Sequence, residues 1–458
     1  MNPKPDGFIG AVMAAEGVSD MTTLLHGPDG CRKNLAALSR SLLPKGGRCD
    51  LSTPFYRGFP AVPCTGIGPS DYIFGSGGRL TEALRFVGGR TDGPVAVMCS
   101  PGASLIGDDC SKAIEDSGME GRAVVIGEDT MSSPLCGAYD AAIERILRSL
   151  APREDGMAPG TVSLVGLSVL TKDWRTVTSE FSAMLGMMGL EVLASPGAGS
   201  PSEDLRRSAG AELCVVMCPE YAHLTSSFYR DRGSEVVSLG HAPVGFAATR
   251  ELILKVADAS GRDPSAALEY IRGFERRARE CMLSAQENVS GRTFRLEADA
   301  SVALPLTRWL CDDLGLVPTS VICPSGPGAA DGLGRYLEGM GLGGVFGAAP
   351  RSEPYYAFCD GNTARLEELS GVCRRGVDIM FPSKLNTDFR PSPVMGPSGA
   401  MYLLDRVVNP FPNRRDNRSG SPPSGLPLSD QDVQEQRTAD ERCNHADGDV
   451  GRPRDLGD

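Results

Sequence analysis

The stretch His26-Gly27-Pro28-Asp29-Gly30-Cys31 gives the strongest indication of fold and chemistry in this 458-residue sequence. It follows an apolar run from Phe8 to Leu25 whose spacing predicts a helix, and its glycines and proline predict that the helix ends there. Glycines beside a cysteine let backbone N–H groups approach the sulfur closely. Such hydrogen bonds stabilise charge on a thiolate, which suits a ligand of a metal cluster. The alternative is that Cys31 is a small buried apolar residue.

Two later cysteines lie in comparable loops. Cys99 ends a short apolar strand predicted at Val95–Cys99, and loops that follow strands carry the chemistry of many α/β folds. Cys64 lies in a turn that precedes another strand, which we predict at Tyr72–Phe74. Cys64 and Cys99 are therefore candidate ligands together with Cys31.

The composition is that of a globular protein with room for two or three domains. The sequence has 46 basic and 58 acidic residues, and this net charge of −12 argues against a nucleic-acid partner. It contains no apolar run of about 18 residues and no secretion signal pattern, so we expect no membrane association and a cytoplasmic location. Fourteen cysteines then indicate a reducing compartment, in which disulfides are rare and some cysteines can be ligands.

Predicted strands and helices alternate along the chain, as is typical of parallel α/β layers. We predict three Rossmann-like domains with parallel sheets: residues 1–150 with the cysteine motifs, residues 160–290, and residues 291–411 with a closing helix. A strand is predicted at Ser301–Leu304 in the third. Residues 412–458 contain few apolar side chains, so we predict a disordered tail that cannot offset its ordering entropy by burial.

Three motifs occur in a fixed order: His-Gly-Pro-x-Gly-Cys ending at Cys31, Asp-Tyr-Ile-Phe-Gly at 71–75, and Cys-x-x-x-x-x-Leu-Ile-Gly-Asp-Asp beginning at Cys99. Together they resemble the nitrogenase component 1 superfamily, and the resemblance extends over residues 3–411. It implies a three-domain α/β subunit, an iron–sulfur cluster at a subunit interface, and an ATP-dependent iron protein that supplies electrons.

The resemblance also implies the cluster ligands. Cys31 and Cys99 match the two motif positions that hold cluster iron, so two thiolates from each of two chains would complete a [4Fe-4S] cluster. Asp6 stands where the family often has a further cysteine, and it is either a metal ligand or the cap of the helix that begins near Phe8. Cys64 is a further candidate metal ligand, although the family position that it matches loosely is not usually one.

Within the superfamily, this sequence most resembles the large subunit of the Ni-sirohydrochlorin a,c-diamide reductive cyclase. That subunit similarly opens near a Pro-x-Pro, here Pro3-Lys4-Pro5, and similarly lacks the family cysteine at the place of Asp6. Cys218 resembles the cysteine that holds the active-site cofactor of nitrogenase. The stretch Arg390–Ala400 resembles the region with the partner histidine but contains no histidine. Reduction of dinitrogen on an iron–molybdenum cofactor is therefore not expected.

These implications define the expected function. We expect an oxidoreductase subunit that passes electrons from an iron protein, a P-loop ATPase, through the cluster to a small-molecule substrate, for which a tetrapyrrole is our first choice. The subunit would pair with a second copy or with a homologous subunit. A non-catalytic scaffold for metallocluster assembly and a structural subunit beside a catalytic homologue are the alternatives.

Overall fold

A computed structural model describes residues 6–39, 55–56, 59–60, 62–126, 133–151, 156–283, 285, 289–324, 331–349, 353–383, 385 and 388–409. Within these ranges the chain forms three parallel β-sheets flanked by helices, and one short antiparallel strand pair, β2 (Phe55–Tyr56) with β3 (Phe59–Pro60). The α/β architecture with three parallel sheets is therefore confirmed, whereas the predicted tail at 412–458 lies outside the described residues.

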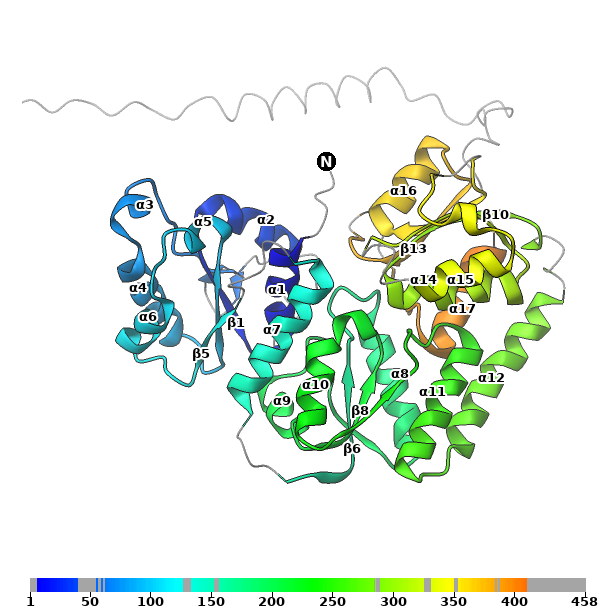
Figure 1. Ribbon diagram of the computed structural model, residues 1–458, viewed down its shortest axis with the longest axis horizontal. Helices are drawn as coiled ribbons and strands as arrows, with labels where there is room; N and C mark the ends of the chain where they lie inside the picture. The colour runs from blue at the N-terminus through cyan, green and yellow to red at the C-terminus, as the bar shows by residue number, and fades with distance from the viewer. Residues whose placement is uncertain are drawn as a thin grey trace, which may run out of the picture. The chain divides into compact units, whose positions relative to one another are not determined.

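The first sheet carries the cysteine motifs, and its strands run in the order β1-β4-β5. All three strands are parallel, and the register places His26 of β1 opposite Cys99 of β4. The strands and main flanking helices are β1 (Thr22–His26), β4 (Val95–Cys99), β5 (Ala123–Ile126), α1 (Gly7–Glu16), α2 (Asp29–Ser39), α4 (Gly77–Gly88) and α6 (Cys110–Ser117). Figure 1 shows them in blue to cyan.

The second sheet has the order β7-β6-β8-β9, again with parallel pairs throughout. Its strands are β6 (Ala158–Val165), β7 (Glu191–Ala194), β8 (Ala211–Val216) and β9 (Glu235–Ser238). Its helices are α8 (Trp174–Met187), α9 (Ser202–Ser208), the short η1 (Pro219–Tyr221), α10 (His223–Asp231), α11 (Gly245–Ser260) and α12 (Ser265–Met282). The central strand β8 is buried except at Glu212, which fits the apolar run Leu213–Val216.

The third sheet has the order β11-β10-β12-β13 and is also parallel. Its strands are β10 (Thr293–Glu297), β11 (Val317–Ile322), β12 (Tyr356–Asp360) and β13 (Arg375–Met380). The accompanying helices are α14 (Ala300–Arg308), η2 (Trp309–Asp313), α15 (Asp331–Gly339), η4 (Gly343–Val345), α16 (Gly361–Ser370) and α17 (Gly396–Val408). Residues 1–408 belong to one compact unit, and the predicted domain boundaries within it stay predictions.

Helix α7 (Leu135–Leu150) links the first two sheets (Figure 1). It packs against α1 and also against α9, α10 and η1. Gly10 of α1 lies so close to the carbonyl of Leu135 that a Cβ at Gly10 would collide with it. On the other side, the Asp140 carboxylate accepts hydrogen bonds from the backbone N–H groups of Leu224 and Thr225, at 2.6 and 2.9 Å.

A buried ion-pair network joins the second and third sheets. Lys172, in the segment between β6 and α8, places its Nζ 2.9 Å from Oδ2 of Asp378 in β13 and 2.8 Å from Oδ2 of Asp388. Asp388 also pairs with Arg406 of α17 at 2.9 Å. The two carboxylates outweigh the effect of burial and raise the pKa of Lys172 above its usual value, so the ammonium stays charged at neutral pH.

Three predicted elements are wrong. The run Phe8–Leu25 is not one helix: α1 ends at Glu16, and Thr22–His26 form strand β1. Tyr72–Phe74 belong to the short helix α3 (Asp71–Phe74) instead of a strand. Ser301–Leu304 lie in helix α14, and the strand that opens the third sheet comes earlier, at Thr293–Glu297. None of the described helices is long and apolar enough to cross a membrane.

Candidate metal-cluster site

The cysteine motifs meet at the carboxyl edge of the first sheet. Strand β1 ends at His26, the Gly27-Pro28 turn follows, and α2 begins at Asp29, so Cys31 lies in the first turn of a helix. The motif is thus a strand-to-helix turn and not the end of a helix. A Cβ at Gly27 would collide with the Ser100 side chain, which explains the glycine between two closely packed strand ends. Cys99 ends the neighbouring strand β4.

Cys64 lies along the open side of β1. Its neighbours hold the segment there through the hydrogen bonds Leu25 N–H to Pro63 O at 2.8 Å and Thr65 N–H to Leu25 O at 3.0 Å. The Cys64 thiol donates to the carbonyl of Gly27 at 3.0 Å. Burial raises the pKa of the Cys64 thiol, and the charges of Asp29 and Cys31 add to this increase, whereas the Gly66 N–H and Arg32 oppose it. The raised pKa favours the protonated form of the Cys64 thiol.

His26 connects the first and third sequence motifs and contacts Ser76, the residue directly after the second. Its side chain is buried, with Nδ1 3.1 Å from Oγ1 of Thr65 and Nε2 3.1 Å from Oδ2 of Asp108. Ser76 donates its backbone N–H to Oδ1 of Asp108 at 3.0 Å, and its hydroxyl also binds this carboxylate. Burial by itself would raise the pKa of Asp108, but the hydrogen bonds from Ser76 and His26 outweigh it and lower the pKa. This network holds the loops that carry the cysteines in fixed relative positions.

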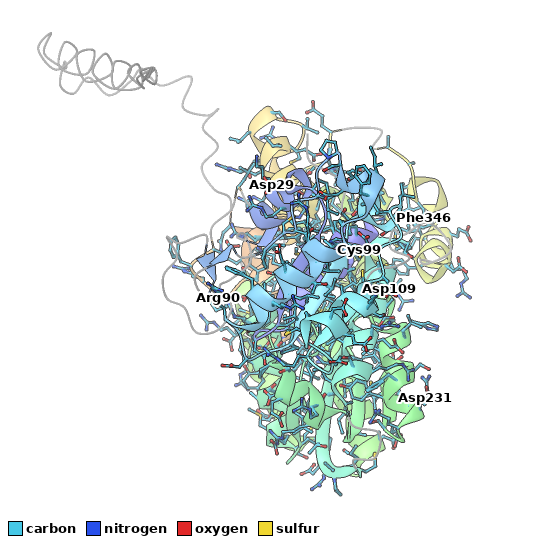
Figure 2. The ribbon with its side chains drawn as sticks, turned by 90° about the vertical axis from the view of Figure 1, so that its left-hand side faces the viewer. Asp29, Arg90, Cys99, Asp109, Asp231 and Phe346 are labelled. Carbon is cyan, nitrogen blue, oxygen red and sulfur yellow. The ribbon has the colours of Figure 1, made fainter. Side chains whose placement is uncertain are left out.

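A fourth cysteine belongs to this edge, and the sequence motifs did not reveal it. The Sγ atoms of Cys99 and Cys110 are 3.4 Å apart. Cys110 is the first residue of α6, whose N-terminus is capped by Asp109 accepting from Lys112 N–H at 2.9 Å. Figure 2 shows the labelled Cys99 and Asp109 near one another. The Leu-Ile-Gly-Asp-Asp motif ends directly before Cys110, and this adjacency was the available signal.

Asp6 caps helix α1. Its Oδ1 accepts a hydrogen bond from Ile9 N–H at 2.9 Å, and the side chain is exposed. This is the helix-cap interpretation that the sequence left open, and ligation of metal by Asp6 stays a prediction. Helices α1 and α2 contact one another, and both begin at the same end of the first sheet (Figure 1). Asp6 therefore lies at the same end of the first sheet as Cys31.

The cysteines at this edge have the donor chemistry of an iron–sulfur site. Thiolates are the usual ligands of such clusters, and Cys31, Cys64 and Cys99 are all partly accessible. Among the described residues, however, no group of three or more His, Cys, Asp or Glu side chains converges closely enough to hold a metal ion. The described part of one chain thus offers thiols for a portion of a cluster site.

Cys218 lies in a different environment, after β8 in the second sheet. It is buried, and burial together with the charges of Glu220 and Asp299 raises the pKa of its thiol well above the usual value. Glu220 accepts from the N–H groups of Ala300 and Ser301 at 3.0 and 2.9 Å. Burial and the Glu220 charge raise the pKa of Asp299 to about 7. A thiol that resists ionisation is a poor metal ligand in this state.

The described residues thus form three parallel α/β sheets, with thiols gathered at the carboxyl edge of the first. The family described as nitrogenase component 1 type oxidoreductase matches residues 7–411. The chain therefore belongs to this family. The recognition made from the three motifs is confirmed over nearly the whole chain.

Curated relatives and a solved structure agree with this assignment. The chain is 22% identical over 338 residues to the nitrogenase molybdenum-iron protein beta chain of Clostridium pasteurianum, covering 69% of each. It is 29% identical over 190 residues to a subunit of the light-independent protochlorophyllide reductase of Rhodospirillum rubrum, covering 37% of this chain and about a third (34%) of that subunit. The fold matches the structure titled nitrogenase Cp1 at pH 6.5 with a TM-score of 0.72 and 17% identity, over 92% of this chain and 94% of that one.

Proposed function

We propose that the chain is the cluster-holding subunit of a nitrogenase-like reductase in which Cys31 and Cys99 from each of two subunits bind one [4Fe-4S] cluster. The observation that carries this proposal is the position of the two thiols. Both lie at the carboxyl edge of one parallel sheet, partly accessible, within a hydrogen-bonded set of loops. A bound cluster would supply one-electron transfer.

An exposed apolar patch beside the thiols supports a subunit interface. Tyr72, Ile73 and Phe74 of α3 and Leu105, directly after the short helix α5 (Pro101–Ser104), are all exposed, Phe74 and Leu105 by 85% each. The two segments are neighbours. Gly102 of α5 lies so close to the Tyr72 hydroxyl that a Cβ at Gly102 would contact it. Exposed apolar patches of this kind mark protein–protein contacts. A second copy of this chain, or a homologous subunit, would cover the patch and bring the missing ligands.

The chain's own residues hold the site in shape. The buried His26 links Thr65, beside Cys64, to Asp108, in the loop that follows Cys99. Preorganised loops of this kind keep ligands in position without a further ordering cost when the metal binds. In this proposal Asp6 and Cys64 are secondary candidate ligands.

The electron donor and substrate follow from the family. We infer an ATP-dependent iron protein as the donor, and a tetrapyrrole as the small-molecule substrate, because curated relatives are named protochlorophyllide reductase subunits. The relative from Cereibacter sphaeroides is 23% identical over 320 residues and covers 69% of this chain and 57% of that subunit. The place of action that we infer is the cytoplasm.

Anaerobic reconstitution with iron and sulfide tests the proposal. The expected result is one [4Fe-4S] cluster per two chains, with visible absorption that bleaches on reduction. Cys31→Ala and Cys99→Ala should each remove this absorption, whereas Cys281→Ser on the exposed face of α12 should keep it. Retention of the cluster in both alanine variants would overturn the ligand assignment.

The same preparation separates the reductase from an assembly scaffold. A reductase keeps its cluster through repeated reduction by an iron protein and ATP. A scaffold releases the cluster to an acceptor apoprotein under the same anaerobic conditions. The scaffold function would be favoured if the cluster passes to the acceptor and its binding to this chain still requires Cys31 and Cys99.

A further inference from the structure

Cys99 and Cys110 are close enough to react with one another. Their Sγ atoms are 3.4 Å apart, and both side chains are partly accessible. A disulfide has an S–S distance of about 2.05 Å, so the two sulfurs must approach by about 1.4 Å. Rotation of the two side chains about their Cα–Cβ bonds changes the distance between the sulfurs.

Separate elements hold the two cysteines in place. Cys99 ends the buried strand β4, whereas Cys110 begins α6, and α6 packs on the first sheet through Ala113 and Ile114. The loop between them is fixed by Asp108, which binds His26 and Ser76. The short distance between the thiols is therefore a feature of the packed domain and does not depend on a freely moving loop.

We propose that Cys99 and Cys110 form a reversible disulfide in the cluster-free chain when it meets hydrogen peroxide. One thiol is first oxidised: the sulfur takes oxygen from the peroxide, giving a sulfenic acid and one water. The second thiol then displaces the hydroxyl from that sulfur as a second water, and the S–S bond forms. In sum, two thiols and one hydrogen peroxide give one disulfide and two waters, and a dithiol reductant reverses the reaction.

The consequence for the metal site rests on the proposed function. A disulfide sulfur does not bind iron as a thiolate does, so the oxidised chain cannot use Cys99 as a ligand. The disulfide also protects Cys99 from sulfinic acid, which thiols do not reduce. Cys110 would then preserve a ligand during exposure to oxidant and return it on reduction.

Peptide mapping of the full-length, cluster-free chain tests this inference. Trypsin cleaves after Arg90 and Lys112 and leaves both cysteines in one peptide, which contains no other cysteine. After one equivalent of peroxide and an alkylating reagent, the peptide should be lighter by two hydrogens and carry no alkyl group. Treatment with dithiol before alkylation should restore two alkyl groups. A peptide that still takes two alkyl groups after peroxide, while the exposed Cys281 is oxidised, would overturn the inference.

The variant Cys110→Ser supplies the second measurement. It should bind the cluster like the unmodified chain. After two or more equivalents of peroxide followed by dithiol it should not regain cluster-binding capacity, because the second equivalent oxidises the unprotected Cys99 sulfenic acid to sulfinic acid, which dithiol does not reduce. Loss of the cluster in unoxidised Cys110→Ser would overturn the inference by making Cys110 a ligand. If instead Cys99→Ala keeps the cluster, the proposed ligand set fails, while the disulfide found in the peptide still supports this inference.

Discussion

Replacing Lys172 by methionine is expected to weaken the connection between the second and third sheets. The Lys172 side chain is 7% exposed and that of Asp378 is 4% exposed, so the variant removes an ammonium that lies 2.9 Å from a buried carboxylate. Removing one partner of a buried ion pair costs about 3–5 kcal/mol. Asp388 is 21% exposed and keeps Arg406, so we expect the lower end, a loss of about 3 kcal/mol in the free energy of unfolding.

Urea unfolding followed by circular dichroism measures this loss, and hydrogen exchange locates it. Amides of β13 should exchange faster in Lys172→Met, and those of β1 and β4 should not change. The matched control is Arg272→Met, which removes an exposed pair with Glu269 at 3.3 Å and should cost less than about 1 kcal/mol. Adding Asp378→Asn to Lys172→Met should recover part of the stability. An unfolding free energy within about 0.5 kcal/mol of the unmodified chain would refute the reasoning.

Three further predictions concern packing, capping and pH. Gly10→Ala should destabilise the chain by about 1–3 kcal/mol, because the added Cβ collides with the Leu135 carbonyl. The control Gly186→Ala places its Cβ in open space on α8 and should not destabilise the chain. Thermal unfolding compares the two variants. Asp6→Ala should cost about 1 kcal/mol through the lost cap of α1, and cluster content per chain shows whether Asp6 also binds iron. Burial raises the pKa of Asp299, so the folded chain keeps a proton that the unfolded chain has lost, and stability falls as pH rises from about 4 to about 7. Asp299→Asn should flatten this fall, and an unchanged pH profile of the urea midpoint would contradict it.

The sequence predicted the sheet architecture well where a short apolar strand is followed by turn residues and an amphipathic helix. It failed where burial hides periodicity. The residues of α1 are buried on nearly every side and those of β1 on both faces, so the run from Phe8 to Leu25 has no clear polar pattern to mark the change from helix to strand. Tyr72–Phe74 have strand-forming side chains but are exposed, which fits a contact surface better than a sheet.

The candidate site shows the same division. Cys31 and Cys99 were found because short motifs surround them, and both lie at the sheet edge where those motifs predict chemistry. Cys110 was missed because its place directly after the Leu-Ile-Gly-Asp-Asp motif does not reveal its contact with Cys99, which depends on how α6 packs against the sheet. The role of His26 was open for the same reason, since Thr65 and Asp108 approach it from distant parts of the chain.

Helix α7 has a practical consequence for anyone who cuts this chain into pieces. A recombinant fragment beginning at residue 160 would lack the surface on which α9 and α10 rest, and it would also lose the Asp140 carboxylate that binds the first turn of α10. Apolar side chains normally covered by α7 would meet water and favour aggregation. A fragment that begins near residue 133 would carry this helix along and should be the better starting material.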